Sequence, residues 1–113
     1  MTDPVSGASV LERVFEVIQN RRGGDAETSN TARLFAKGRG KIAQKVGEEA
    51  TEAIVAALAE TPERLAAESA DLLYHLMVLW AEVGITPDDV WAELRKREGV
   101  PSGRQADAET ETG

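Results

Sequence analysis

The apolar positions of this chain recur with the spacing of α-helices. Near the start, Val10, Val14, Val17 and Ile18 follow one another at intervals that place them on one helix face. No stretch alternates between apolar and polar residues in the manner of a half-buried strand. The pattern therefore predicts an all-α fold.

Turn residues separate the predicted helices. Gly38 divides a short helix from a long one, and Gly84 ends the next long helix. Thr61-Pro62 separates the two long helices, because proline disfavours helix in the residue before it but fits the first turn of the following helix. Ser9 and Thr86 are the expected N-caps of the first and last helices. We expect helices over residues 9–22, 31–37, 39–60, 62–83 and 87–98.

The two long helices should form an antiparallel hairpin, since the turn between them is short. The second of them is apolar around most of its circumference between residues 72 and 83. A helix of that kind must be buried on nearly every side, and one hairpin with flanking helices cannot cover it. We therefore expect an obligate homodimer, in which two hairpins complete a four-helix-bundle core.

Length and composition bound the rest of the picture. The 113 residues fit one domain, which we expect to comprise a flexible N-terminus (1–8), an all-α domain (9–99) and a disordered acidic tail (100–113). The absence of cysteine excludes disulfides and thiolate metal sites. The apolar segments are too short to span a membrane, and the N-terminus lacks the pattern of a signal peptide, which predicts a cytoplasmic protein. The net charge of −7 disfavours a nucleic-acid partner.

One carboxylate interrupts the apolar stripe of the first long helix. On a helical wheel, Glu49 lies in the centre of the stripe that contains Ile42 and Ala53. Glu52 lies at the edge of the stripe and Glu48 lies further round. A carboxylate at a packing position needs a partner, so this helix face is a candidate site.

Carboxylates on the two long helices also match in height. Glu52 and Glu49 lie nine and twelve residues before Thr61. Glu68 and Asp71 lie seven and ten residues after it, so a rise of about 1.5 Å per residue brings the two pairs to one level of the hairpin. Such a cluster cannot stay fully ionised without cations, and oxygen ligands suit Mg²⁺ or Mn²⁺; the alternative is a set of solvated helix faces. The predicted metal ligands are Glu48, Glu49, Glu52, Glu68 and Asp71.

A basic run precedes the acidic motif. Between Thr28 and Gly47 the chain carries five basic residues and no acid. Next to a metal cluster, such a run would hold the part of a polyphosphate that the metal does not; the alternative is a solvated turn at a helix start. The predicted phosphate-binding residues are Arg33, Lys37, Arg39, Lys41 and Lys45.

The single histidine, His75, lies one turn after Asp71. A di-iron bundle would require a Glu-x-x-His pair on each of two helices, so one histidine at another spacing argues against that class. His75 is either a partner of a metal ligand or an ordinary polar position on the flank of the helix.

The motifs resemble those of a known group of enzymes. "EEATE" followed by "ESAD" matches the E-E-x-x-E … E-x-x-D pattern of the MazG-like, all-α nucleoside triphosphate pyrophosphohydrolases. "KVGEEATE" and "ADLLYHL" are similar to the phosphoribosyl-ATP pyrophosphohydrolase family, over roughly residues 9–99. The resemblance implies Mg²⁺-dependent hydrolysis of N1-(5-phosphoribosyl)-ATP to N1-(5-phosphoribosyl)-AMP and pyrophosphate, the second step of histidine biosynthesis, and it also points to a dimer.

The resemblance also implies roles for individual residues. Glu49, Glu52, Glu68 and Asp71 would be metal ligands, and Glu48 a further ligand or the group that orients the attacking water, which makes Glu48 and Glu49 the catalytic candidates. Where the family segment usually carries an aromatic residue after a serine, this chain has Asn30.

Two other functions stay open from the sequence. The first is a housecleaning (d)NTP pyrophosphatase of the MazG or dUTPase type, which would use the same carboxylates with a different base pocket. The second is a non-catalytic helical interaction module, which would bind no divalent metal.

Overall fold

The computed structural model describes residues 7–99, and within this range it contains five helices and no strand. The predicted all-α class is therefore confirmed. The expectations for residues 1–6 and 100–113 lie outside the described residues. No helix in the described range combines the length and apolarity needed to cross a membrane. The helices are α1 (Gly7–Arg21), α2 (Asn30–Lys37), α3 (Arg39–Ala59), α4 (Pro62–Val83) and α5 (Pro87–Arg95).

Capping residues set most of the helix boundaries. The Thr61 hydroxyl accepts a hydrogen bond from the Arg64 backbone N–H at the start of α4. Thr86 and Asp89 form a reciprocal capping box at the start of α5, where each side chain accepts from the other's backbone N–H. The prediction that Ser9 caps the first helix is wrong, because α1 begins at Gly7 and Ser9 lies buried within its first turn.

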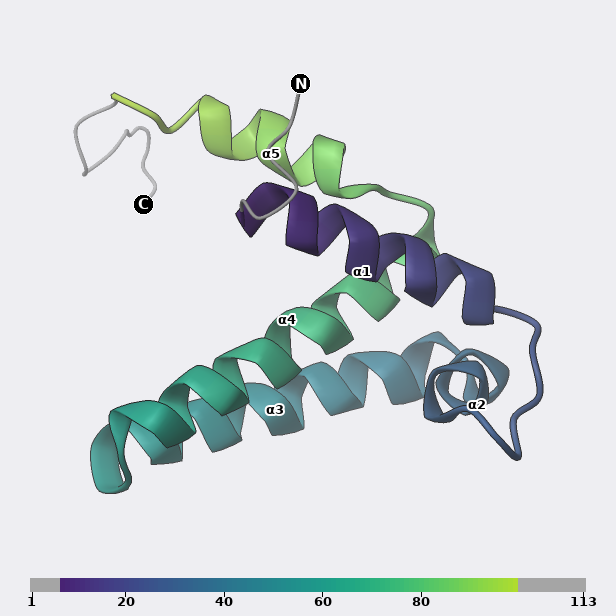
Figure 1. The fold of residues 1–113 in the computed structure, drawn as a ribbon, viewed down its shortest axis with the longest axis horizontal. Helices are drawn as coiled ribbons and strands as arrows, with labels where there is room; N and C mark the ends of the chain where they lie inside the picture. The colour runs from purple at the N-terminus through teal and green to yellow at the C-terminus, as the bar shows by residue number, and fades with distance from the viewer. Residues whose placement is uncertain (1–6, 100–113) are drawn as a thin grey trace.

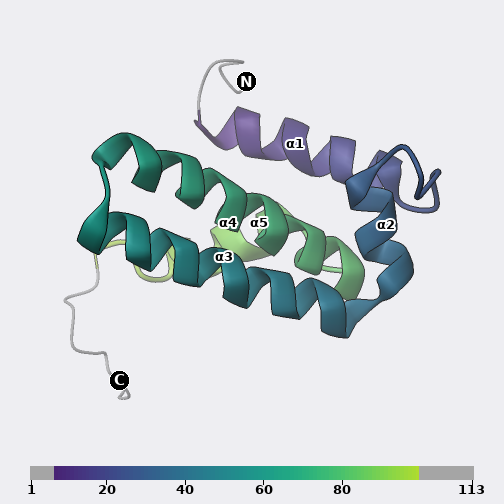
Figure 2. The same cartoon turned by 90° about the horizontal axis from the view of Figure 1, so that it is seen from below.

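Helices α3 and α4 form the predicted antiparallel hairpin, which is the longest feature of the molecule (Figure 1). Helix α1 lies across the C-terminal half of α4, and α5 lies beside α1. The tip of the hairpin, around the turn that joins α3 to α4, extends beyond the other helices (Figures 1 and 2). The packing within one chain is therefore concentrated at the base of the hairpin.

The buried core lies where α1, α3 and α4 meet. Its most buried members are Ile18, Ile42 and Val78, one from each of these helices. Phe15, Met77 and Ala81 complete the cluster. Because α1 packs on one side of α4, Met77 and Val78 are buried within one chain, whereas Val83 at the end of the same apolar segment is 42% exposed.

Helix α2 crosses the base of the hairpin and is held there by one direct hydrogen bond and by Arg22, which contacts both α2 and α4 (Figure 2). The Thr31 and Tyr74 hydroxyls are hydrogen-bonded at 2.6 Å, which ties the start of α2 to α4. The Arg22 guanidinium stacks on the Phe35 ring at 4.9 Å and donates to the Ala81 carbonyl oxygen at 2.7 Å. These contacts determine where the side chains of α2 lie relative to α3.

Candidate metal centre and adjoining pocket

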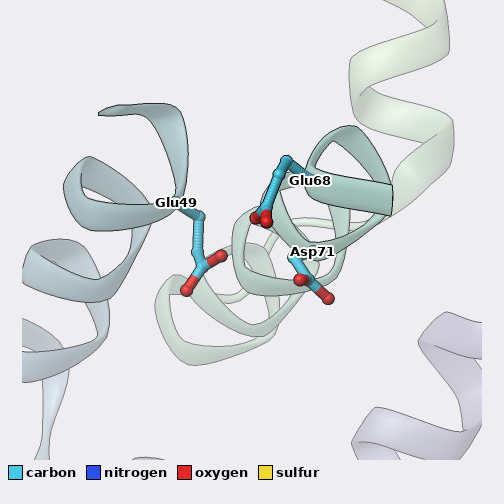
Figure 3. A group of neighbouring side chains, drawn as sticks. All are labelled: Glu49, Glu68 and Asp71. Atoms are coloured by element: carbon cyan, nitrogen blue, oxygen red, sulfur yellow. The ribbon is translucent and has the colours of Figure 1, made fainter. Parts of the chain in front are cut away.

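Three carboxylates meet across the hairpin. Glu49 extends from α3, and Glu68 and Asp71 extend from α4, with the Glu68 carboxylate turned toward that of Glu49 (Figure 3). One oxygen of each residue lies within 4.8 Å of the others. Glu49 and Glu68 are buried and Asp71 is exposed, so the cluster opens to solvent on one side. The three residues therefore lie at one level of the hairpin, as their spacing from Thr61 predicts.

Helical periodicity explains how a carboxylate comes to be buried here. The buried positions of α3 are Ile42, Glu49 and Ala56, which lie seven residues apart along one line of the helix. Seven residues make nearly two turns, so all three face α4. Glu49 is therefore buried because of its position in the packing stripe, with only 7% of its surface exposed.

Nearby cations offset part of the negative charge. The Lys45 ammonium lies 3.7 Å from the Glu49 carboxylate, and the Arg64 guanidinium pairs with Glu68. Even so, burial and the adjacent Glu52 carboxylate raise the pKa of Glu68 above its usual value. The groups around Glu68 therefore do not fully stabilise its ionised form.

The donor set fits a hard divalent cation. Oxygen Oε1 of Glu68 is buried and accepts no hydrogen bond from any of the described residues. A buried carboxylate oxygen without a donor is costly, and a metal ion would supply the missing positive partner. Carboxylate oxygens are the ligands preferred by Mg²⁺ and Mn²⁺.

The other two predicted ligands lie in different surroundings. Glu52 lies near enough to Glu68 to help raise its pKa, so it adjoins the cluster. Glu48 is exposed and lies outside the group of three; its carboxylate accepts from the Gln44 amide at 2.8 Å and pairs with Lys45 at 3.4 Å. These contacts with Gln44 and Lys45 lower the pKa of Glu48, so its carboxylate is ionised at neutral pH.

A pocket of about 380 Å³ lies between α2, α3 and α4, and Lys45 in its lining contacts Glu49 of the cluster at 3.7 Å. Four of its lining residues come from the predicted basic run, and Glu48 also lines it. Arg39 is the exception in the run, since it does not line this pocket and its guanidinium lies 3.8 Å from the Glu82 carboxylate. The lining comprises Asn30, Arg33, Leu34, Lys37, Lys41, Lys45, Glu48 and His75.

Two residues near the site have no role assigned to them from the sequence. Arg64 pairs with Glu68, and the signal for this pair is their i,i+4 spacing on one helix. Asn30 lines the pocket because α2 crosses the hairpin, and no local sequence pattern predicts that position. His75, whose role the sequence left open, also lines the pocket, and its Nδ1 lies 2.8 Å from the Asp71 carbonyl oxygen.

Comparisons with known proteins agree on one family. The family model described as phosphoribosyl-ATP pyrophosphohydrolase matches residues 11–98. A phosphoribosyl-ATP pyrophosphatase of Rhodospirillum rubrum is 60% identical over 97 residues, which cover 86% of this chain and 83% of the relative. Proteins of the same name from Paramagnetospirillum magneticum and Azospirillum brasilense are 58% identical over 93 residues and 52% identical over 100 residues. These matches cover 82% and 88% of this chain, and 85% and 90% of the respective relatives.

Proposed function

This chain belongs to the phosphoribosyl-ATP pyrophosphohydrolase family, and from that premise we propose that it hydrolyses N1-(5-phosphoribosyl)-ATP to N1-(5-phosphoribosyl)-AMP and pyrophosphate, the second step of histidine biosynthesis. The observation that carries the proposal is the meeting of Glu49, Glu68 and Asp71 beside a basic pocket. An acidic protein can bind an anionic nucleotide in this way, because the cation lies between the carboxylates and the phosphates.

The carboxylate cluster would hold Mg²⁺, with Mn²⁺ as a substitute. Glu49, Glu68 and Asp71 would be the ligands, and Glu52, which adjoins Glu68, would join them. When bound, a divalent cation neutralises phosphate charge and makes a water molecule more acidic. The unpartnered Oε1 of Glu68 supports this assignment.

The side chains around the cluster supply the remaining chemistry. Glu48 is ionised, lines the pocket and pairs with Lys45, which also contacts Glu49, so we propose that it orients the attacking water and accepts its proton. The water oxygen bonds to phosphorus while the bond from the α-phosphate to the pyrophosphate group breaks. Lys41 and Lys45 line the pocket on the same face of α3 and would offset the charge that develops on the departing pyrophosphate.

The two alternative functions, a housecleaning pyrophosphatase and a non-catalytic interaction module, are less well supported. The three relatives described above carry the phosphoribosyl-ATP pyrophosphatase name, which does not favour a housecleaning (d)NTP pyrophosphatase. The cluster of carboxylates, two of them buried, does not favour a purely structural helical module. We also propose that the enzyme acts in the cytoplasm as a homodimer, with a small-molecule nucleotide as its substrate.

A comparison of substrates tests the proposal. With Mg²⁺ present, we expect pyrophosphate release from N1-(5-phosphoribosyl)-ATP at a much higher kcat/KM than from dUTP, dCTP or other nucleoside triphosphates. A preference for one of the dNTPs would favour the housecleaning alternative. Calorimetric titration with Mn²⁺ tests the interaction-module reading, which predicts no binding of metal.

A further inference from the structure

The pocket holds more positive charge than its carboxylates can balance. Lys45 pairs with both Glu48 and Glu49, and Lys41 acts electrostatically on Glu48. Arg33 and Lys37 line the same pocket, but neither forms an ion pair with any carboxylate in the range that the structure describes. The cations on α2 are therefore available for an anion that comes with the ligand.

The amide of Asn30 adds a hydrogen-bond donor to these two cations. Its Oδ1 accepts a hydrogen bond from the Arg33 guanidinium, so its Nδ2 group remains available to the pocket. Asn30, Arg33 and Lys37 lie on α2 within two turns of one another. Together they present only donors to a ligand, which suits the oxygens of a phosphate group.

The α2 side of the pocket is separated from the carboxylate cluster. Lys45 contacts Glu49, and Lys41 lies one turn earlier on α3, roughly 6 Å further toward the start of that helix. Helix α2 lies on the other side of the bend at Gly38, before the start of α3, and crosses the base of the hairpin (Figure 2). A phosphate bound by Arg33 and Lys37 would thus lie apart from phosphates bound at the cluster.

We propose that Asn30, Arg33 and Lys37 form a separate subsite for a sugar 5-phosphate, a phosphate monoester carried at the end of the ligand opposite its triphosphate. This inference rests on the proposed function, whose substrate has a second ribose phosphate that ATP lacks. The subsite would bind that group, while the metal, Lys41 and Lys45 act on the triphosphate. The enzyme would then distinguish its substrate from ATP by the charge on α2.

Two variants and one competitor test the subsite. We expect Lys37→Ala and Arg33→Ala each to raise KM for N1-(5-phosphoribosyl)-ATP about tenfold or more, since each removes a charged hydrogen bond. The inhibition constant of ATP, measured with Mg²⁺ as a competitor, should stay unchanged in both variants. Equal losses for ATP and the substrate, or no loss for either, would overturn the proposal.

Arg21→Ala is the matched control, because Arg21 occupies the last turn of α1 as Lys37 occupies the last turn of α2. It should leave KM and the ATP inhibition constant as in the wild type. Circular dichroism of all three variants checks that the helices are retained.

A direct titration separates failure of the subsite from failure of the proposed function. Ribose 5-phosphate, added to the wild type and followed by NMR, should shift amide signals of α2, and Lys37→Ala should weaken this binding; ribose is the control ligand. If the wild type does not turn over N1-(5-phosphoribosyl)-ATP but still binds ribose 5-phosphate through Lys37, only the proposed function fails. Absence of ribose 5-phosphate binding to the wild type would overturn the subsite.

Discussion

Two adjacent glutamates show how the fold gives neighbouring residues different roles. Glu49 lies on the packing line of α3 and is buried in the carboxylate cluster. Glu48, one residue earlier, is rotated by about 100° around the helix and faces Gln44, Lys45 and the pocket. A single helical step therefore separates a candidate metal ligand from a candidate group for orienting water.

Replacing Glu49 with glutamine tests the metal site. Glu49→Gln keeps the shape of the side chain but removes its charge, so we expect Mn²⁺ affinity to fall at least about tenfold and turnover to be lost. The melting temperature without metal should hold or rise, because repulsion among the carboxylates is relieved. Mn²⁺ should raise the melting temperature of the wild type but not of the variant.

Calorimetry, thermal unfolding and steady-state kinetics measure these three effects. Glu16→Gln, which alters an exposed glutamate on α1, is the control and should behave as the wild type. Near-normal activity of Glu49→Gln would show that the site assignment is wrong.

At the scale of elements, the junction of α2 and α3 determines the shape of the pocket. Gly38 connects the two helices with φ 98° and ψ 175°, a conformation that residues with a side chain rarely adopt. Its backbone N–H also donates to the carbonyl oxygens of Leu34 and Phe35 at the end of α2. The angle between the two helices that carry the basic residues therefore depends on this glycine.

We expect Gly38→Ala to lower the free energy of unfolding by about 1–3 kcal/mol, because an L side chain is strained at this φ. The KM for the nucleotide should rise as α2 shifts relative to α3. Gly40→Ala is the matched control, since Gly40 is helical and an added Cβ would meet no atom within 4 Å. It should be neutral or slightly stabilising.

Urea unfolding and steady-state kinetics of the two variants provide the comparison. Equal stability of Gly38→Ala and Gly40→Ala would mean that the backbone at residue 38 relaxes without cost.

At the scale of the whole molecule, one chain leaves the tip of its hairpin uncovered. Leu58 is 83% exposed and Ile54 is 59% exposed on α3, and Leu73 on α4 is also exposed. The other helices pack at the opposite end of the hairpin (Figure 1). Two such hairpins would form a four-helix core if their tips packed together, which is why we retain the prediction of an obligate homodimer.

We expect light scattering coupled to size exclusion to give twice the mass of the 12.2 kDa chain at low micromolar concentration. Leu58→Glu should dissociate or unfold the dimer, because it places a charge in the apolar interface. Val17→Glu, at an exposed apolar position on α1, is the control and should remain dimeric. A stable, folded wild-type monomer would contradict the prediction.

The sequence alone determined the helices and much of the cluster. Local signals such as Thr61-Pro62, Gly84 and the Thr86 cap act over a few residues, so they predict boundaries without knowledge of the fold. The meeting of Glu49 with Glu68 also follows from the sequence, since a short turn and a constant rise per residue set their relative height. The start of α1 was predicted wrongly because Ser9 is a favourable cap that the helix passes through.

Only the tertiary structure decided how the helices face one another. Asn30 lines the pocket because α2 is oriented by contacts between residues far apart in the chain, among them the hydrogen bond between Thr31 and Tyr74. Arg39, at the start of α3, lies outside the pocket because the end of α4 brings Glu82 beside it. Such contacts depend on the packing of three helices at once, and no helical period encodes them. The carboxylate cluster comes from one hairpin and its regular geometry, whereas the pocket depends on the placement of a third element.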